Sequence, residues 1–257
     1  MITLQQGNTT VTIEAGELVG FKNQGHEFIH QKGSPGWRSS DTEMFPIIGP
    51  VNEAGFRGKG PKGNAVQDQH GLLRELDYVL ERNTETTASF VKKYKAGIPV
   101  KNSKFPQKSS EEWLVWPYDF RFEKTFRLKD NQLEISFKIS GEENMPFMLG
   151  YHPAFKLHTE RPLIIAGQDK IQLDDVLEVG NRAFQVKNTT SILLRDKRDI
   201  TISTEGFGHF MCWTEVRNMI CIEPISFYPY TVSQDQLHQG FQHLKGEQVV
   251  FKVVLSV

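Results

Sequence analysis

The feature that most constrains the fold is an alternation of apolar and polar residues between positions 120 and 139. Apart from Lys124, apolar residues share one parity and charged or hydroxyl residues share the other in two runs, 120–128 and 133–139. A turn-like sequence, 129–132, separates the two runs. A side-chain period of two is typical of a β-strand with one buried face and one solvated face. Two such runs joined by a short polar turn predict a β-hairpin.

Shorter runs of the same kind recur along the chain. They lie near residues 11–13, 88–91, 200–202, 220–222 and 249–257. No long stretch repeats apolar residues at helical spacing, so we expect few and short helices. Many short strands with turn signals between them are typical of a large antiparallel β-sandwich or barrel. Because no linker rich in Pro, Gly or Ser divides the 257 residues, we expect residues 1–257 to form one domain.

The middle of the chain contains a basic stretch, residues 92–110, and an ambiguous stretch, residues 109–117. Residues 92–110 are basic and contain one glycine and two prolines, which favours an exposed loop or hairpin. At the end of this stretch, Ser109-x-x-Glu112 resembles a helix capping box. The sequence Trp-Leu-Val-Trp comes next and precedes Pro117, and β-formers before a proline favour a strand.

Charge and cysteine content exclude several classes of protein. Thirty basic and 31 acidic side chains nearly cancel, whereas a nucleic-acid binder usually has a basic excess. The first residues lack the basic and apolar regions of a signal peptide, and no apolar run is long enough to span a membrane. Cys212 and Cys221, which a hairpin could place face to face, are too few for a disulfide framework. We therefore expect reduced thiols and a cytoplasmic protein that binds neither nucleic acid nor membrane.

Four segments place polar or ionisable residues inside otherwise apolar sequence. These segments are 44–52, 67–74, 149–155 and 220–224. The last of them ends in Glu223, which follows an apolar run that predicts a buried strand. A carboxylate there has a desolvation cost unless it is paired or lines a cavity, although a strand-end Glu can also point to solvent. Pro224 cannot donate to a strand ladder, so Glu223 is expected where a strand opens into a pocket.

His70 and His152 lie in two of these segments, and each has a structural alternative. A single histidine in apolar sequence often serves only to satisfy local hydrogen bonds, and the residues alone leave both interpretations open. No histidine pair has the spacing of a helical metal site, and no HExxH motif is present. The alternative is a metal site assembled from histidines and acidic residues that are distant in the sequence. We expect neither a metal nor a cofactor.

The four segments, in this order, resemble the aldose 1-epimerase (galactose mutarotase) family, in particular its small bacterial aldose-1-epimerase-like branch. The family has Phe-Pro-x-x-Gly, His-Gly followed by an arginine, Gly-x-His-Pro-Ala-Phe, and a strand ending in Glu-Pro. The resemblance covers roughly residues 35–257, including a similar closing strand near residues 240–247. The matching motifs are Phe45–Gly49, His70–Arg74, Gly150–Phe155 and Cys221–Pro224.

The resemblance implies a galactose mutarotase-type β-sandwich with an open sugar cleft on one sheet. It also implies that Glu223 is the general base for the anomeric hydroxyl and that His152 is the general acid for the ring oxygen. His70 would bind or polarise the same part of the sugar. The residues assigned to substrate binding around these three are Asn52, Arg57, Gln69, Arg74 and Tyr151.

This pattern predicts an isomerase that interconverts the α and β anomers of an aldose without a cofactor. Its partner would be the sugar alone, and the chain would be a monomer or homodimer. Two alternatives stay open: a hexose-6-phosphate mutarotase, with Arg57 and Arg74 as phosphate ligands, and a carbohydrate-binding protein without turnover. Departures from the family pattern at Pro50, Leu72–Leu73 and Ile225 leave the identity of the sugar open.

Overall fold

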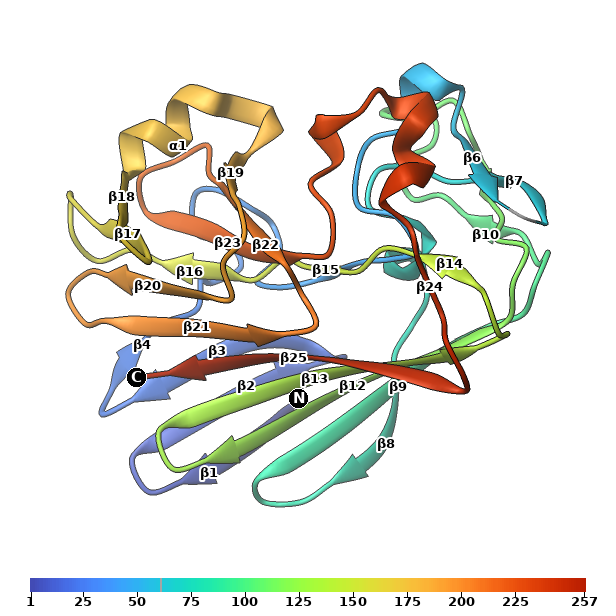
Figure 1. Cartoon of the computed structure of the whole chain (residues 1–257). Coiled ribbons are helices and arrows are strands. Elements are labelled where there is room, and N and C mark those ends of the chain that lie inside the picture. Colours follow the sequence, from blue (N-terminus) through green and yellow to red (C-terminus); the bar gives the residue numbers. More distant parts are fainter. Residues whose placement is uncertain (61) are drawn as a thin grey trace.

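A computed structural model describes residues 1–60 and 62–257. Its largest sheet is antiparallel and has nine strands (Figure 1). In spatial order these are β18 (Asp169–Gln172), β17 (Leu163–Ala166), β20 (Ser191–Arg195), β21 (Ile200–Glu205), β25 (Gln248–Ser256), β13 (Gln132–Gly141), β12 (Phe120–Lys129), β9 (Thr87–Tyr94) and β8 (Val79–Asn83).

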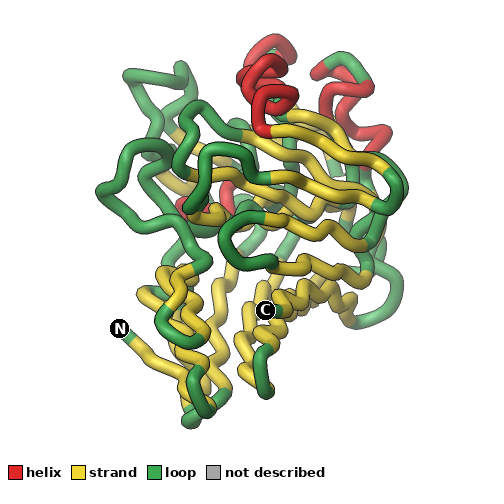
Figure 2. Tube along the Cα trace, turned by 90° about the vertical axis from the view of Figure 1, so that its left-hand side faces the viewer, coloured by secondary structure: helices red, strands yellow, loops and turns green. Residues whose placement is uncertain are grey.

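A second antiparallel sheet lies above the first in Figure 1, and the layered arrangement is visible from the side in Figure 2. It contains β19 (Phe184–Val186), β22 (His209–Trp213), β23 (Met219–Ile225), β15 (Gly150–Tyr151) and β5 (Glu43–Met44), and β16 (Ala154–Lys156) also pairs with β23. The N-terminal sheet contains β1 (Ile2–Gln6), β2 (Thr9–Glu14), β3 (Glu17–Asn23) and β4 (His26–Glu27).

The remaining elements are short. Three two-stranded ribbons pair β6 (Arg57–Gly60) with β7 (Gly63–Val66), β10 (Val100–Lys101) with β11 (Trp113–Leu114), and β14 (Pro146–Phe147) with β24 (Gln242–His243). The helices of the described residues are α1 (Leu173–Val179), η1 (Asn52–Ala54), η2 (Leu72–Glu75), η3 (Gly180–Arg182), η4 (Pro229–Thr231) and η5 (Gln234–Gly240). No helix among the described residues is long and apolar enough to cross a membrane.

The predicted hairpin is confirmed. β12 and β13 pair from Phe120↔Gly141 to Lys129↔Gln132, so the turn lies where the sequence places it. One side of each strand packs into a core between the sheets, where Phe137 of β13 meets Tyr151 of β15 with ring centroids 5.0 Å apart. The predicted all-β antiparallel fold with few short helices is therefore correct.

Most of segment 92–110 is exposed, as predicted, but some of its side chains are buried. Lys92 belongs to β9, is only 6% exposed, and donates a hydrogen bond to Leu73 O at 2.9 Å. Asn102 is 1% exposed and bonds to Asp68. Long-range polar partners bury these two side chains, and composition does not reveal such partners. The strand predicted before Pro117 is present as the short β11.

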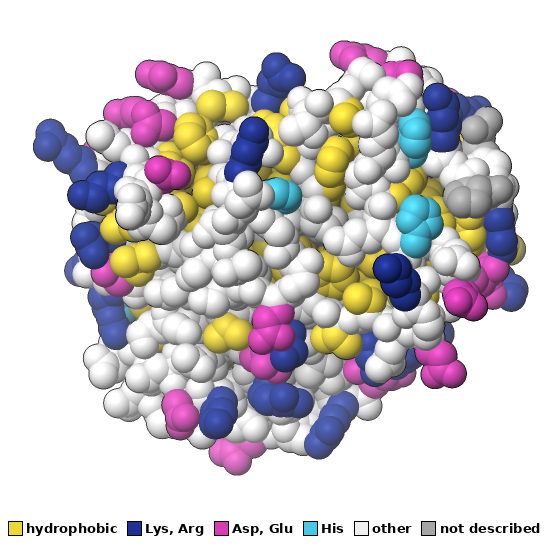
Figure 3. Space-filling model, viewed as in Figure 1, with side chains coloured by type: hydrophobic (Ala, Val, Ile, Leu, Met, Phe, Trp, Pro, Cys, Tyr) yellow, Lys and Arg dark blue, Asp and Glu magenta, His cyan; other side chains and the backbone are white. Residues whose placement is uncertain are grey.

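Surface charge is mixed in sign. On the face drawn in Figure 3, basic and acidic side chains are interspersed among the described residues, and neither sign forms a continuous patch. This distribution agrees with the nearly balanced counts of 30 basic and 31 acidic residues.

A buried ion cluster joins the two sheets. Lys124 occupies a core-facing position of β12, is 0% exposed, and lies 2.7 Å from Asp41 Oδ2 and 2.7 Å from Glu43 Oε1. The Tyr151 hydroxyl also donates to Asp41 Oδ2 at 2.7 Å. Burial alone would lower the pKa of Lys124, but the two acidic charges outweigh burial and raise it. The cluster therefore fixes Tyr151, the last residue of β15, against β12.

We predict that Lys124→Met lowers the free energy of unfolding by about 3–5 kcal/mol, because Asp41 and Glu43 would stay buried without their cation. The matched control is Lys138→Met, whose half-exposed ion pair with Glu123 should contribute less than about 1 kcal/mol. Urea unfolding followed by circular dichroism measures both. Equal losses in the two variants would contradict a special role for the buried cluster.

Candidate functional site

A cleft of about 590 Å³ opens on the side of the second sheet that faces away from the core. Strand β23 explains why the cleft is polar. Ile220 and Ile222 point into the core between the sheets, so the alternate residue Glu223 points to the opposite face. Glu223, His152 and His70 all line this cleft. The structure thus brings together the three residues that the sequence assigned to catalysis.

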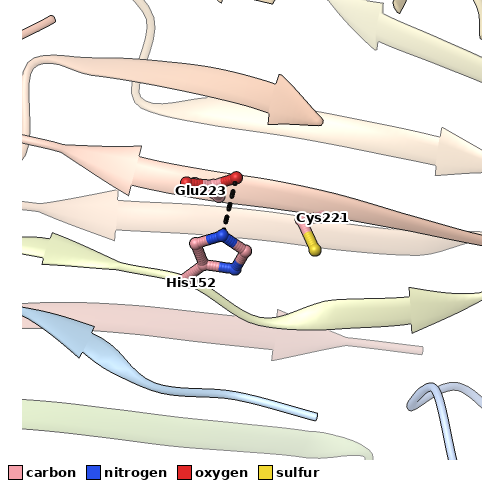
Figure 4. Close-up of side chains that lie close together, drawn as sticks. All are labelled: His152, Cys221 and Glu223. Carbon is pink, nitrogen blue, oxygen red and sulfur yellow. Dashed lines mark ion pairs between the residues drawn. The ribbon is translucent and has the colours of Figure 1, made fainter. Parts of the chain in front are cut away.

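Glu223 and His152 form a close pair. His152 Nε2 lies 3.3 Å from Glu223 Oε1, and the side chains are 8% and 1% exposed, respectively (Figure 4). Reciprocal backbone hydrogen bonds with Thr42, of 2.8 and 3.2 Å, hold His152 just after β15. Glu223 is fixed by the pairing of β23 with β22, where it lies opposite Met211.

The surroundings of the pair favour its uncharged forms. Burial raises the pKa of Glu223 well above its ordinary value, against the opposing effect of the nearby Arg74 charge. Burial, together with Arg74, lowers the pKa of His152 well below its ordinary value. Opposite shifts in a carboxyl group and an imidazole in contact give a pair that holds one proton between them near neutral pH. Such a pair can release a proton at one atom and accept one at the other.

His70 lies close to this pair, with its ring centroid 6.0 Å from that of His152. Its Nδ1 lies 2.5 Å from Ile48 O, and a carbonyl oxygen can only accept a hydrogen bond. Nδ1 therefore carries the proton, and in the neutral ring Nε2 is an acceptor. Burial, followed by the charges of Arg74 and His152, lowers the pKa of His70 well below its ordinary value, which maintains that neutral form.

Arg74 provides a fixed positive charge at the base of the cleft. Its Nε donates to Glu43 O at 3.0 Å, and its buried Nη2 has no hydrogen-bond partner among the described residues. Burial lowers its pKa to about 10, with Glu223 acting in the opposite direction, so the guanidinium stays charged at neutral pH. Nη2 of Arg74 thus has its N–H donors left for a ligand.

The five predicted substrate-binding residues divide into two groups. Asn52, Gln69 and Arg74 line the cleft. Tyr151 does not: it is fully buried in the core and its hydroxyl bonds to Asp41, because successive residues of β15 point to opposite faces. Arg57 is exposed on the β6–β7 ribbon and is not part of the cleft wall. The structure therefore contradicts the assignments of Tyr151 and Arg57.

Sequence reasoning missed several cleft residues. Trp37 packs against His152 in a tilted arrangement with ring centroids 4.3 Å apart, and Trp213 meets it edge-on at 6.1 Å. Lys104 and Lys108 also line the cleft, and Lys104 Nζ lies 2.9 Å from Asp68 Oδ1. Trp37 follows Ser-Pro-Gly in an irregular segment, and nothing in that local sequence signals a site. The basic character of 92–110 was the available signal for the lysines, and it was interpreted as a solvated surface.

The two cysteines lie on opposite faces of the sheet. Cys212 pairs in register with Ile222 and belongs to the core between the sheets, whereas Cys221 packs with Ala154 and Met219 on the cleft side. The two cysteines lie on paired strands, as a hairpin allows, but their thiols do not face each other. The potential metal ligands of the site are His152, Cys221 and Glu223, whose donor atoms lie within 4.8 Å of one another.

The turn at His70 depends on the following glycine. His70 has a φ of 74°, and Gly71 has φ 75° and ψ 172°, a backbone conformation that is essentially restricted to glycine. A Cβ on Gly71 would lie 2.2 Å from Phe45 O. This close approach allows His70 O to accept a hydrogen bond from Phe45 N at 3.1 Å. The turn thereby fixes the segment that presents His70 to the cleft.

We predict that Gly71→Ala lowers the free energy of unfolding by at least about 3 kcal/mol, through backbone strain together with the clash. Gly97→Ala is the control, because Gly97 also has a positive φ (77°) but has no atom within 4 Å of an added Cβ. We expect it to cost about 1 kcal/mol, from the left-handed backbone alone. Chemical denaturation measures both, and similar losses would show that the contact with Phe45 is unimportant.

Comparisons with known proteins agree with this architecture. The family model described as aldose 1-epimerase matches residues 50–242. A search of curated proteins finds no match.

Several solved structures are similar over nearly the whole chain. A galactose mutarotase related enzyme from Lactobacillus acidophilus has a TM-score of 0.78 and 20% identity, covering 99% of this chain and 96% of that one. A galactose mutarotase-like protein from Lactobacillus casei has a TM-score of 0.79 and 18% identity, covering 99% of both chains. An aldose epimerase homologue from C. elegans has a TM-score of 0.69 and 10% identity, covering 99% and 97%. The predicted galactose mutarotase-type sandwich is confirmed.

Proposed function

This chain belongs to the aldose 1-epimerase family, and from that premise we propose that it interconverts the α and β anomers of an aldose sugar. The observation that carries the proposal is the contact of 3.3 Å between His152 Nε2 and Glu223 Oε1 in the wall of a cleft of about 590 Å³. A cleft of this size is within the range of small-molecule sites.

Mutarotation needs one proton removed and one proton supplied. The reaction starts when the single proton of the pair lies on His152 and Glu223 is the carboxylate, the form that the Arg74 charge favours. Glu223 then takes the proton from the anomeric hydroxyl, while His152 gives its proton to the ring oxygen, and the C1–O5 bond breaks. The open aldehyde rotates about C1–C2, and the reverse transfers close the ring on the other face. The sugar gains and loses no atoms, and the pair ends with the single proton that it held at the start. Each positioned acid or base contributes about 10²–10⁴ in rate.

The neighbouring residues hold the sugar in this scheme. His70 accepts a hydrogen bond from a sugar hydroxyl through Nε2, since its Nδ1–H is directed at Ile48 O. Arg74 donates an N–H of Nη2 to a sugar oxygen and, as a charge, favours the carboxylate form of Glu223. Asn52 and Gln69 provide further polar contacts from the cleft wall. Trp37 covers His152 and offers an apolar surface of the kind on which sugar rings pack.

We also propose that the enzyme works in the cytoplasm, as a monomer or homodimer, without a cofactor. The free, buried state of both cysteines is consistent with a reducing compartment.

We predict that Glu223→Gln and His152→Asn each slow catalysed mutarotation at least about 100-fold, because each removes one proton-transfer group. The measurement is optical rotation of freshly dissolved α-D-glucose and α-D-galactose. His243→Asn is the matched control, since His243 is exposed on β24 and is not part of the cleft wall. Wild-type rates in either site variant would refute the assigned roles. Sugar binding without any acceleration by the native protein would favour a non-catalytic binding protein.

One observation favours a phosphorylated sugar as a second candidate. Lys104 and Lys108 both line the cleft, together with Arg74. Asp68 neutralises Lys104 through a contact of 2.9 Å, whereas Lys108 is exposed at the wall. The basic side chains Arg74, Lys104 and Lys108 outnumber the acidic side chains of the wall, Asp68 and Glu223, even when Glu223 is the carboxylate. The cleft therefore has an excess of positive charge, which suits an anionic sugar.

The two substrates can be separated with one variant. If the substrate is phosphorylated, Lys108→Gln should raise KM for glucose 6-phosphate about tenfold more than KM for glucose, because one charge-assisted hydrogen bond is lost. NMR exchange between anomers measures both sugars. Lys101→Gln is the control, since Lys101 is exposed on β10 and is not part of the cleft wall. If Lys108→Gln leaves the ratio of the two KM values unchanged, the free aldose is the substrate.

A further inference from the structure

Cys221 has no role in the proposed proton transfers, yet it lies beside the pair that has one. It precedes Glu223 by two residues on β23, so both side chains point to the same face of the sheet. Figure 4 shows the sulfur of Cys221, the ring of His152 and the carboxylate of Glu223 grouped together. One donor atom from each of the three lies within 4.8 Å of the others, and all three residues are buried.

Two polar atoms of this group lack partners. Glu223 Oε2 and His152 Nδ1 are buried and have no hydrogen bond to any described residue. Glu223 is 1% exposed and His152 is 6% exposed. A buried polar atom without a partner has an unfavourable desolvation cost, which a ligand that pairs with it would offset. Glu223 therefore has one unused acceptor, on the carboxylate oxygen that is not in contact with His152.

We propose that this group, a ring nitrogen of His152, Cys221 Sγ and a carboxylate oxygen of Glu223, is a binding site for a zinc ion. Imidazole, thiolate and carboxylate are the three zinc ligand types in proteins, and three protein ligands leave one coordination position open. His152 and Glu223 line the cleft, so that position faces the space where a small molecule enters. The thiolate selects zinc over the oxygen-preferring cations such as Mg²⁺ and Ca²⁺.

The surroundings of Cys221 suit a metal–thiolate bond. Trp37 and Trp213 pack against the cluster of Ala154, Met219 and Cys221, which keeps the sulfur away from water. Burial raises the pKa of the Cys221 thiol, but a bound zinc ion deprotonates a coordinating thiol outright. Binding therefore sends two protons to the solvent, one from the thiol and one from the His152–Glu223 pair. No electron is transferred.

Zinc at this site would engage both proton-transfer groups at once. The structure thus predicts that the metal and the sugar compete, and that zinc inhibits mutarotation reversibly. The inhibition rests on the proposed function. The binding does not, because it depends only on the three ligands.

Cobalt(II) is the probe for binding, since it occupies zinc sites and its bond to a thiolate absorbs in the near ultraviolet. We expect titration of the native chain with Co²⁺ to produce this absorption, and Zn²⁺ to abolish it. Cys221→Ser should lose the absorption. Cys212→Ser is the matched control and should keep it, because Cys212 is equally buried but faces the core. Glu223→Gln should weaken Co²⁺ binding at least about tenfold, through the loss of one charged ligand.

Circular dichroism establishes that each variant is folded, and Cys221→Ala replaces Cys221→Ser if the serine variant is not. Absence of Co²⁺ absorption in the folded native chain overturns the proposal. Absorption that persists without Cys221, or that disappears equally without Cys212, also overturns it.

Polarimetry in the presence of Zn²⁺ then tests the inhibition separately. We expect Cys221→Ser, measured against its own metal-free rate, to need at least tenfold more Zn²⁺ for half-inhibition than the native chain. Co²⁺ absorption together with no mutarotation under any condition would reject the proposed function and leave the zinc site standing. Mutarotation without Co²⁺ absorption would reject the zinc site and leave the proposed function standing.

Discussion

Burial of β23 on both faces is the constraint on which the rest of the site depends. Its even-numbered residues pack into the core between the sheets, so its odd-numbered residues must occupy the opposite face, beneath the loops that form the cleft. Cys221 and Glu223 are therefore placed together by the period of the strand. The core that holds Ile220 and Ile222 also fixes the direction in which the carboxylate points.

Desolvation then sets the chemistry of the cleft. The same burial raises the pKa of Glu223 and lowers the pKa of His152, so two groups with ordinary values near 4.3 and 6.5 become a pair that holds one proton. Arg74 opposes part of the shift at Glu223 while it adds to the shift at His152. The cost of keeping these groups out of water is offset by the rigid sheets that hold them in contact.

The ion cluster of Lys124, Asp41 and Glu43 connects the core to the site. Tyr151 bonds to this cluster, and the next residue along the chain is His152. Arg74 bonds to the backbone of Glu43. The cluster therefore orients two cleft residues without touching the cleft itself. A buried charge in a core-facing position of β12 breaks the apolar pattern of that strand, and its partners come from a segment about 80 residues earlier in the chain.

The sequence by itself determined the all-β character, the β12–β13 hairpin, the family and the motifs that contain His70, His152 and Glu223, because a two-residue period and short motifs are local properties. Only the tertiary structure decided which way each side chain points. It turned Tyr151 into the core, left Arg57 outside the cleft, and brought Trp37 and Lys104 into its wall. It also separated the two thiols onto opposite faces and placed one beside the acid–base pair. These outcomes depend on pairing between strands that are distant in the chain, and no local pattern of residues specifies that pairing.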